Sequence, residues 1–456
     1  MAGESRATRK ENKENRAAAK KRKRRRGRVP GAWGTYRESY REAIALTGPV
    51  LPLVSFLGRL PLAMCQLGTL LLVAETSGSL ATAGLVGGAL AAGQTVGGPV
   101  LGRAADRRGQ RPVVLCATLL NALSVAALVL AALARADTLP LALIAVVAGA
   151  SVPQIGPMAR TRTLALARRE DADERLVGTV LSFEGTLDEV TFVLGPALVG
   201  LAVALAHPAA ALLVAAGLLA VCGTWFALHP TASLLRPAAR AASVERTRAR
   251  GSVYALRTAM ALQGAMFGAC QAGITALTDD LGHPEQAGLV YAAMGVMSAV
   301  AGLSMAAVPA RIGLHTRWRI ATAALVVLSV PLVFVGSLWQ LYVVVVVVGI
   351  ALAPHMITIF GLTERVVPAT RLAESMAFLM SGIVAGQALA LAVSGRLAES
   401  SGPPAAFAVA VGAALLCAGL SWAVRTRPAP GRTAARGTTN RVTRDAEEPS
   451  GSGRSA

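Results

Sequence analysis

Long apolar runs separated by short polar stretches dominate the chain. Each run approaches the 20 residues that a helix needs to cross a bilayer, and the runs are apolar on all sides rather than along one stripe. This pattern predicts an all-α polytopic membrane protein with about twelve transmembrane helices. The predicted spans are residues 49–73, 80–101, 113–133, 139–159, 177–203, 208–228, 253–277, 286–308, 319–337, 340–361, 373–396 and 403–424. The weakest boundary is at 336–339, where a single span would give an odd number.

Composition agrees with the pattern. Of 456 residues, 54% are hydrophobic and 15% charged, whereas soluble proteins carry about 25% charged residues. The cysteines fall within the predicted spans and lack the spacing of a metal site. We therefore expect them to serve as small apolar residues, and we expect no disulfides, no metal and no cofactor. These are Cys65, Cys116, Cys222, Cys270 and Cys417.

Lysine and arginine gather in alternate loops. The basic segments are residues 1–41, 102–112, 159–176, 229–257, 309–319, 362–371 and 425–456. The opposite loops hold only Arg135 and Arg396, and Arg59 lies inside the first span. Because cytoplasmic loops carry the excess of basic residues, this bias predicts a multi-pass protein of the cell membrane with an even number of spans and both termini cytoplasmic.

The same pattern divides the chain into five segments. A Pro/Ala/Arg-rich stretch follows the sixth span and precedes the other six. We therefore predict a basic disordered cytoplasmic tail (1–42), a six-helix bundle (43–228), a cytoplasmic linker (229–252), a second six-helix bundle (253–424) and a disordered tail (425–456). The net charge of +20 follows from topology, and we expect the run 20–26 to lie on anionic lipid headgroups rather than on nucleic acid.

A compact charged turn joins the second and third spans. Residues 102–112 read GRAADRRGQRP, which resembles the signature loop G-x-x-x-D-R-x-G-x-R of the major facilitator superfamily. The matching residues are Gly102, Asp106, Arg107, Gly109 and Arg111. The resemblance implies two six-helix bundles and a secondary transporter. It also implies that residues 310–319 are a degenerate second copy of the loop. It also implies that Asp106 contacts the facing bundle when the cytoplasmic side closes; the local alternative is an aspartate that caps the third helix.

The fifth span carries an unusual group of carboxylates: Glu184, Asp188 and Glu189. Each charge near the centre of a bilayer costs about 2.5–3.5 kcal/mol, so these groups should face protein, water or a cation. Glu184 and Asp188 share a helix face, and Glu189 is rotated by about 100° from Asp188. Arg59 lies at a similar depth, which predicts a buried pair with Asp188 or Glu189. Such a pair is either structural or coupled to protons or substrate; in the second case the carboxyl farther from Arg59 is the better proton carrier.

Further along the fifth span, Gly195, Pro196 and Gly200 resemble the G-P-x-x-G-G element of the family's antiporters. This element implies a kinked fifth helix and export rather than uptake, although Val199 replaces one of its glycines. In the family the seventh and tenth helices line the cavity, so Gln271 and His355 are candidate substrate contacts. Interhelical hydrogen bonding is the alternative for both residues.

These observations favour a proton-coupled exporter of a small organic molecule that works by alternating access, and we expect a monomer. The alanine- and arginine-rich composition is typical of a GC-rich genome, such as that of an actinobacterium. Neither a phosphate-binding Walker loop nor a catalytic constellation occurs, so we expect no enzymatic activity. The alternatives are an uptake symporter for a small nutrient and a membrane sensor or partner protein that does not transport.

Overall fold

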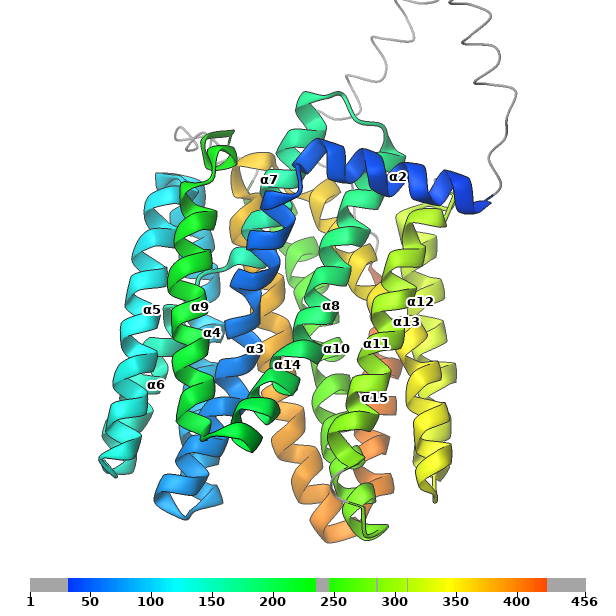
Figure 1. The fold of residues 1–456 in the computed structure, drawn as a ribbon. Helices are drawn as coiled ribbons and strands as arrows, with labels where there is room; N and C mark the ends of the chain where they lie inside the picture. The colour runs from blue at the N-terminus through cyan, green and yellow to red at the C-terminus, as the bar shows by residue number, and fades with distance from the viewer. Residues whose placement is uncertain (1–31, 235–245, 284–285, 310, 425–456) are drawn as a thin grey trace, which may run out of the picture.

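The computed structural model describes residues 32–234, 246–283, 286–309 and 311–424, and these residues form helices joined by short turns (Figure 1). The first bundle comprises α3 (Val50–Ser77), α4 (Leu80–Arg108), α5 (Gln110–Leu133), α6 (Thr138–Ala150), α7 (Ile155–Arg169), α8 (Glu174–Leu205) and α9 (Pro208–Leu228). The second comprises α10 (Arg246–Asp280), α11 (Ala287–Ser304), α12 (Leu314–Ser329), α13 (Leu338–Val366), α14 (Leu372–Ser401) and α15 (Pro403–Ala423). Short 3₁₀ turns are η1 (Pro230–Leu234), η4 (Met305–Ala307), η5 (Val330–Phe334) and η6 (Ala369–Arg371).

The predicted all-α membrane fold is confirmed. Within the described residues, ten stretches are long and apolar enough to cross a membrane, and one of them joins α6 with α7. The glycine-rich helix α4 and the helix α10 run beside these ten and complete two bundles of six spans. The weak boundary at 336–339 is a real turn, because η5 ends at Phe334 and α13 begins at Leu338.

Local sequence sets where several helices begin and end. The hydroxyl of Ser79 accepts a hydrogen bond from the amide of Thr82 and caps α4. In the same way, the carboxylate of Asp173 accepts from the amide of Leu176 at 2.8 Å and caps α8. Gly78 ends α3 with φ +65°, a left-handed conformation that glycine adopts without steric cost.

The fourth predicted span, 139–159, is not one continuous helix. Helix α6 ends at Ala150 and α7 begins at Ile155, so residues 151–154 are unwound. Pro153 has no amide hydrogen to continue the hydrogen-bond ladder, and Pro157 suits the first turn of a new helix. The break therefore divides this span inside the first bundle.

The two bundles share part of their apolar core. Leu164 of α7 and Leu181 of α8 belong to the same buried cluster as Met356 and Phe360 of α13 and Leu372 of α14. A cluster centred on α3, α4, α5, α6 and α9 lies within the first bundle, and one centred on α10, α11, α13 and α15 lies within the second. The interface between bundles is therefore packed where these α7, α8, α13 and α14 residues meet.

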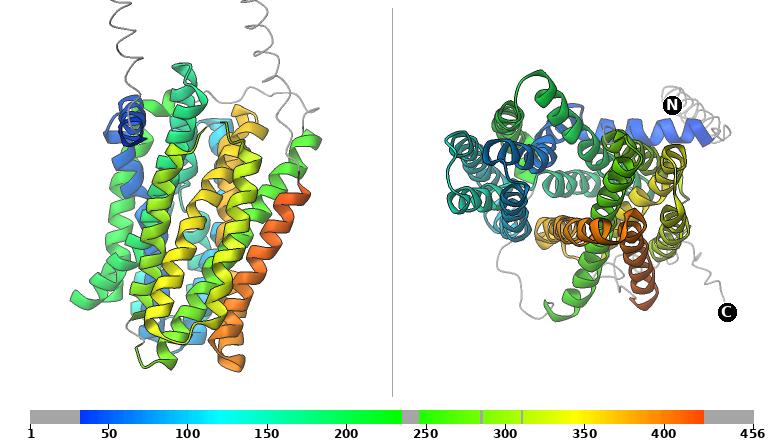
Figure 2. Two further views of the ribbon diagram at one scale, coloured as in Figure 1. Left: turned by 90° about the vertical axis from the view of Figure 1, so that its right-hand side faces the viewer. Right: turned by 90° about the horizontal axis from the view of Figure 1, so that it is seen from below.

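A further helix, α2 (Ala32–Thr47), lies across one end of the molecule (Figure 1). We call this the basic end; the α4–α5, α7–α8 and α13–α14 turns lie there with Arg107, Arg168 and Arg365. Seen from below, α2 extends from the first bundle towards the second (Figure 2).

Helix α2 corrects the predicted disordered tail, which included residues up to 42. The segment folds because Ser39 and Ala43 are buried, and because the hydroxyl of Tyr40 donates to the carbonyl of Leu303 at the end of α11, at 2.7 Å. The other tail residues, 1–31 and 425–456, and linker residues 235–245 lie outside the described part, as does the predicted lipid contact of the basic run. Residues from Arg246 of the predicted linker belong to α10.

Candidate functional site

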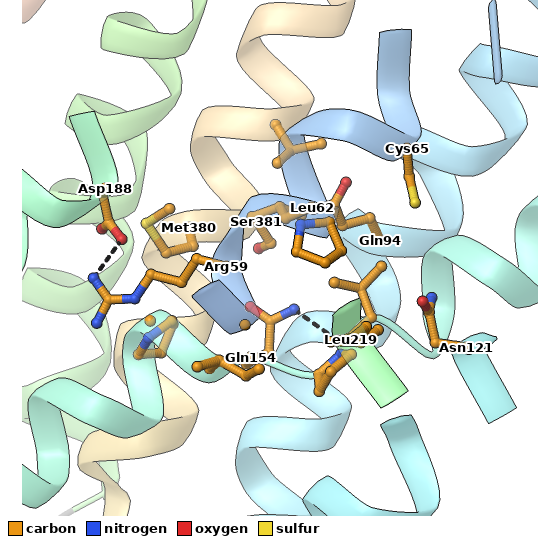
Figure 3. A pocket seen from close by; sticks show the side chains of 18 residues that line it. Arg59, Leu62, Cys65, Gln94, Asn121, Gln154, Asp188, Leu219, Met380 and Ser381 are labelled. Atoms are coloured by element: carbon orange, nitrogen blue, oxygen red, sulfur yellow. Dashed lines mark hydrogen bonds and ion pairs between the residues drawn. The ribbon is translucent and has the colours of Figure 1, made fainter. Parts of the chain in front are cut away.

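Four charged side chains meet inside the first bundle. Nη1 of Arg59 on α3 lies 2.9 Å from Oδ1 of Asp188 on α8, and its other terminal nitrogen pairs with Glu184 one turn earlier. The second oxygen of Asp188 pairs with Arg160 of α7. All four side chains are buried, and Figure 3 shows Arg59 reaching Asp188 from the cavity wall. Their formal charges balance, as burial requires of ionised groups. We call these residues the ion cluster.

Arg160 was not among the predicted site residues. By sequence it stands one residue beyond the predicted fourth span, where arginine is ordinary for a cytoplasmic loop. The break at 151–154 begins a new helix that carries Arg160 into the protein, where it is 0% exposed. Its guanidinium lies 3.7 Å from the ring centroid of Phe360 on α13, so the ion cluster touches the second bundle. The sequence signal that could have found it is Pro153 and Pro157 inside an apolar run.

The same break brings the start of α7 against the ion cluster. A Cβ atom on Gly156 would lie 3.2 Å from Oδ1 of Asp188 and 3.5 Å from Nε of Arg59. Glycine therefore lets the helix terminus approach the pair closely. Because helix N-termini carry partial positive charge, this approach adds to the positive charge that the two arginines place around the Asp188 carboxylate.

Glu189 has different surroundings from its neighbour. It is buried, and it belongs to none of the ion pairs found among the described residues. Its carboxyl instead faces Ser298 on α11, in the second bundle, and its Oε1 has no hydrogen-bond partner among the described residues. Arg59 thus pairs with Asp188, one of the two predicted partners, and with Glu184, while Glu189 stands apart at the interface.

A cavity that is partly open adjoins the ion cluster. Every helix of the first bundle except α6 contributes to its wall, and α14 is the contributor from the second bundle. Polar lining residues include Arg59, Asp188, Gln94, Asn121 and Gln154. Among the described residues, no group of three or more His, Cys, Asp or Glu is arranged to hold a metal ion.

The two predicted substrate contacts in the second half lie elsewhere. Nδ1 of His355 is 2.6 Å from Oε1 of Gln263, and Nε2 accepts from the indole of Trp318 at 3.2 Å. His355 is fully buried in this network, which fits the interhelical alternative. Gln271 is half-buried on α10. Neither His355 nor Gln271 lines the cavity.

The signature loop lies at the basic end, against the second bundle. The carboxylate of Asp106 accepts hydrogen bonds from the amides of Ala373 (3.3 Å) and Glu374 (2.8 Å), at the start of α14. It therefore caps α14 of the facing bundle rather than the third span. A Cβ on Gly102 would lie 2.9 Å from the carbonyl oxygen of Ala373, so glycine permits this close packing.

Other loop residues shape the turn. Gly109 has φ +88°, which favours glycine, and Arg107 and Arg111 are exposed. Asp106 lies beyond the apolar part of α4. Burial raises the pKa of Asp106 to about 7, against the effect of the two amide hydrogen bonds.

Two ion pairs also close the basic end. Arg168 of α7 lies 2.8 Å from Glu364 of α13, and Arg365 of α13 lies 3.5 Å from Glu174 of α8. Both join the first bundle to the second. Together with Asp106 and α14, they hold the two halves in contact at this end.

The predicted helix-five element lies along α8. A Cβ on Gly195 would lie 2.5 Å from Cβ of Ala63 on α3, so this glycine allows α8 and α3 to pack closely. Pro196 lies inside α8. Gly200 has open space around it, and packing gives no reason for a glycine there.

A two-part helical bundle with multiple membrane spans, a buried ion cluster beside a cavity and a closed end between its halves is typical of membrane transporters. The chain belongs to the Major Facilitator Superfamily, whose sequence profile matches residues 45–338 and 258–449. No curated protein sequence matches the chain significantly.

Solved structures share the fold. The human organic anion transporter MFSD10 (TETRAN) is 18% identical with a TM-score of 0.64, over 82% of this chain and 98% of its own. A bacterial homologue of the iron transporter ferroportin in its outward-facing state is 19% identical with a TM-score of 0.66, over 82% and 99%. The E. coli fucose:proton symporter FucP is 14% identical with a TM-score of 0.60, over 84% and 98%. At these identities the likeness concerns the fold alone, and secondary transport follows from family membership.

Proposed function

We propose that the protein is a proton-coupled exporter of a small organic molecule in the cell membrane, with its basic end and both termini on the cytoplasmic side. The observation that carries this proposal is the unequal setting of two adjacent carboxyls. Asp188 lies between Arg59 and Arg160, whereas Glu189 meets Ser298 across the interface.

The two carboxyls suit different tasks. Two arginines and a helix N-terminus surround the carboxylate of Asp188, so it holds the first bundle together and positions Arg59. A buried carboxyl without a cation is stable when it carries a proton. Glu189 is therefore the proton carrier, which agrees with the expectation that the carboxyl farther from Arg59 takes this part.

Alternating access links Glu189 to movement of the bundles. When α8 and α11 separate, Glu189 loses the hydroxyl of Ser298 and gains water, so it can release or take up its proton. At the basic end the same movement breaks the contacts of Asp106 with α14 and the Arg168–Glu364 pair. Proton binding by Glu189 and opening of the basic end thereby both depend on the interface between the two bundles.

Export is favoured by the resemblance of Gly195, Pro196 and Gly200 to the antiporter element. The close contact of Gly195 with Ala63 on α3 supports a structural use of this element between the two helices that carry Asp188 and Arg59. The substrate class expected is a small organic compound.

The test is proton movement in proteoliposomes that contain a pH-sensitive dye, challenged with a chemically broad panel of compounds. In the wild-type protein, addition of a transported compound should cause protons to move across the membrane, which the dye reports. Glu189→Gln should fold and still exchange labelled compound across the membrane without proton movement. Asp188→Asn is the matched neighbour variant, and we expect it to lose folded protein instead. Proton movement that persists in Glu189→Gln contradicts the assignment.

Proton-coupled uptake is the second candidate, because the amides of Gln94, Asn121 and Gln154 line the cavity and suit a polar nutrient. The direction of proton movement separates the two candidates. An antiporter moves protons against the compound flux, and a symporter moves them with it.

A further inference from the structure

Three side-chain amides form a second polar region in the cavity, apart from the ion cluster. Gln94 comes from α4, Asn121 from α5 and Gln154 from the unwound stretch between α6 and α7. They are 4%, 2% and 8% exposed. In Figure 3 Asn121 lies on the opposite side of the view from the Arg59–Asp188 pair, with Gln94 and Gln154 between them. Since the third span and the unwound stretch both contribute, this region lies within the first bundle.

In each amide, one of the two polar groups, the NH₂ or the carbonyl oxygen, forms a hydrogen bond with the protein. Nδ2 of Asn121 donates to the carbonyl of Ala148 at 2.6 Å, and Nε2 of Gln154 donates to the carbonyl of Val152 at 3.1 Å. Oε1 of Gln94 accepts from Nε2 of Gln66 at 3.2 Å. The carbonyl of Ala148 lies in the last turn of α6 and also accepts from the hydroxyl of Ser151, and the carbonyl of Val152 lies in the unwound stretch.

The other half of each amide has no hydrogen bond to any residue in the described part of the chain. What remains is two carbonyl acceptors, on Asn121 and Gln154, and one NH₂ donor, on Gln94. Buried polar groups in native proteins are paired with protein, water or ligand. The bonds of Asn121 and Gln154 stabilise the break, and the bond of Gln94 joins α4 to α3, which leaves the other half of each amide available to water or a ligand in the cavity.

The rest of the lining restricts the ligand. Apolar side chains form much of the wall, among them Leu62, Val152, Leu219, Met380 and Val384. The charges of the ion cluster are balanced among themselves, so a charged ligand would find no free counter-charge there. The ligand that fits has an apolar body and a neutral group that both donates and accepts hydrogen bonds.

We propose that the cavity, bounded by the first bundle and α14, is a binding subsite for a neutral carboxamide or hydroxyl group on an apolar body, held by Gln94, Asn121 and Gln154 of the first bundle. The inference deepens the proposed function, since such a compound would be the transported cargo. It assigns the substrate class to the amides and not to the ion cluster or to the second bundle.

The test uses three matched probes that share one ring: benzamide, benzyl alcohol and toluene. Binding to the purified full-length protein in lipid nanodiscs is measured by ligand-observed NMR titration without a pH gradient, with empty nanodiscs subtracted. Benzamide and benzyl alcohol should bind more tightly than toluene. Gln94→Met and Gln154→Met keep side-chain length and should each weaken benzamide binding about fivefold, the effect of one net hydrogen bond, while toluene binding stays unchanged.

Gln271→Met is the matched control, because this glutamine does not line the cavity, and it should leave benzamide binding unchanged. Size-exclusion profiles check folding, and Asn121→Leu replaces either glutamine variant that fails to fold. Equal binding of benzamide and toluene, or the same benzamide affinity in every variant, overturns the subsite.

Failure of the subsite and failure of the proposed function are distinguishable. Variant-sensitive benzamide binding without any proton movement in vesicles leaves the subsite standing and removes proton coupling. If proton movement depends on Glu189 but benzamide binding is the same in the amide variants, proton coupling stands and the subsite is removed.

Discussion

Both halves of the molecule contain a buried polar network, and the two networks differ in charge and in reach. In the first bundle, Arg59, Arg160, Glu184 and Asp188 carry full charges, border a cavity and touch Phe360 of the other half. In the second, His355 joins Gln263, Trp318 and Cys417 from four helices of the same half. One network borders open space and the other closes on itself.

If the proposed function is right, this difference predicts that proton coupling depends on the first bundle. A closed neutral network satisfies its members and ties helices together, as interhelical hydrogen bonds do in membranes. A charged network beside a cavity and an interface responds to ligands, protons and bundle movement. The first should therefore govern both folding and coupling, and the second folding alone.

The largest expected effect is that of Arg160→Met. It leaves Asp188 with one cation fewer, and breaking a buried ion pair costs about 3–5 kcal/mol. We expect much less folded protein after detergent extraction, measured by size exclusion and thermal unfolding. Arg160→Lys keeps the charge and should recover part of the loss. Wild-type stability in Arg160→Met would mean that the ion cluster adds nothing to the fold.

His355→Leu should have a moderate effect of a different kind. It leaves the indole of Trp318 and the amide oxygen of Gln263 without their partner, which costs about 2 kcal/mol or more. Thermal unfolding should detect the loss, while proton movement per folded molecule stays at the wild-type level. The control is Gln271→Met on α10. Loss of coupling in His355→Leu would break the division between the two halves.

A smaller effect concerns pH at the basic end, where the two halves meet. Burial against α14 raises the pKa of Asp106 to about 7, and Glu374 and Arg371 are the charged groups that face it. When this end opens, the carboxyl gains water and its pKa falls towards the ordinary value. The closed form thus binds the proton more tightly, so closure should strengthen as pH falls from about 7 and weaken as pH rises.

Spin-label distances between Glu170→Cys and Thr316→Cys, in a background without native cysteines, report this opening. The distance distribution should shift towards the open form between pH 5 and pH 8. Asp106→Asn, which stays neutral, should remove most of the shift. The same pH dependence in Asp106→Asn would exclude this carboxyl as the origin.

The smallest effect should come from Tyr40→Phe. The ring, which packs edge-on against Phe183 at 6.2 Å between centroids, is kept, and the hydrogen bond to Leu303 is lost. One net hydrogen bond corresponds to a shift of about fivefold in the open-to-closed ratio. The same spin-label pair measures it, and an unchanged ratio would make α2 a passive surface helix.

Much of the fold could be predicted because it depends on local patterns. Spans of about 20 apolar residues identified the helices. The polar break at 336–339 likewise identified the turn between two of them. The fifth-span carboxylates and Arg59 drew attention because charge inside an apolar run is costly wherever the helix packs. Depth along the chain then matched Arg59 with Asp188 or Glu189, since each residue advances a helix by about 1.5 Å.

The position of a residue along a transmembrane helix gives its depth in the membrane. It does not give the direction in which the side chain points or the helix that it contacts, and only the tertiary structure decided these. The sequence by itself determined an all-helical membrane protein, its two sets of loops and a buried pair between Arg59 and one of the fifth-span carboxylates, Asp188 or Glu189. Packing decided that Arg160 completes the cluster, that Glu189 faces Ser298, and that His355 lies away from the cavity. The physical reason is that a partner on another helix is chosen by the rotation and packing of both helices, and the break at 151–154 alters both for α7.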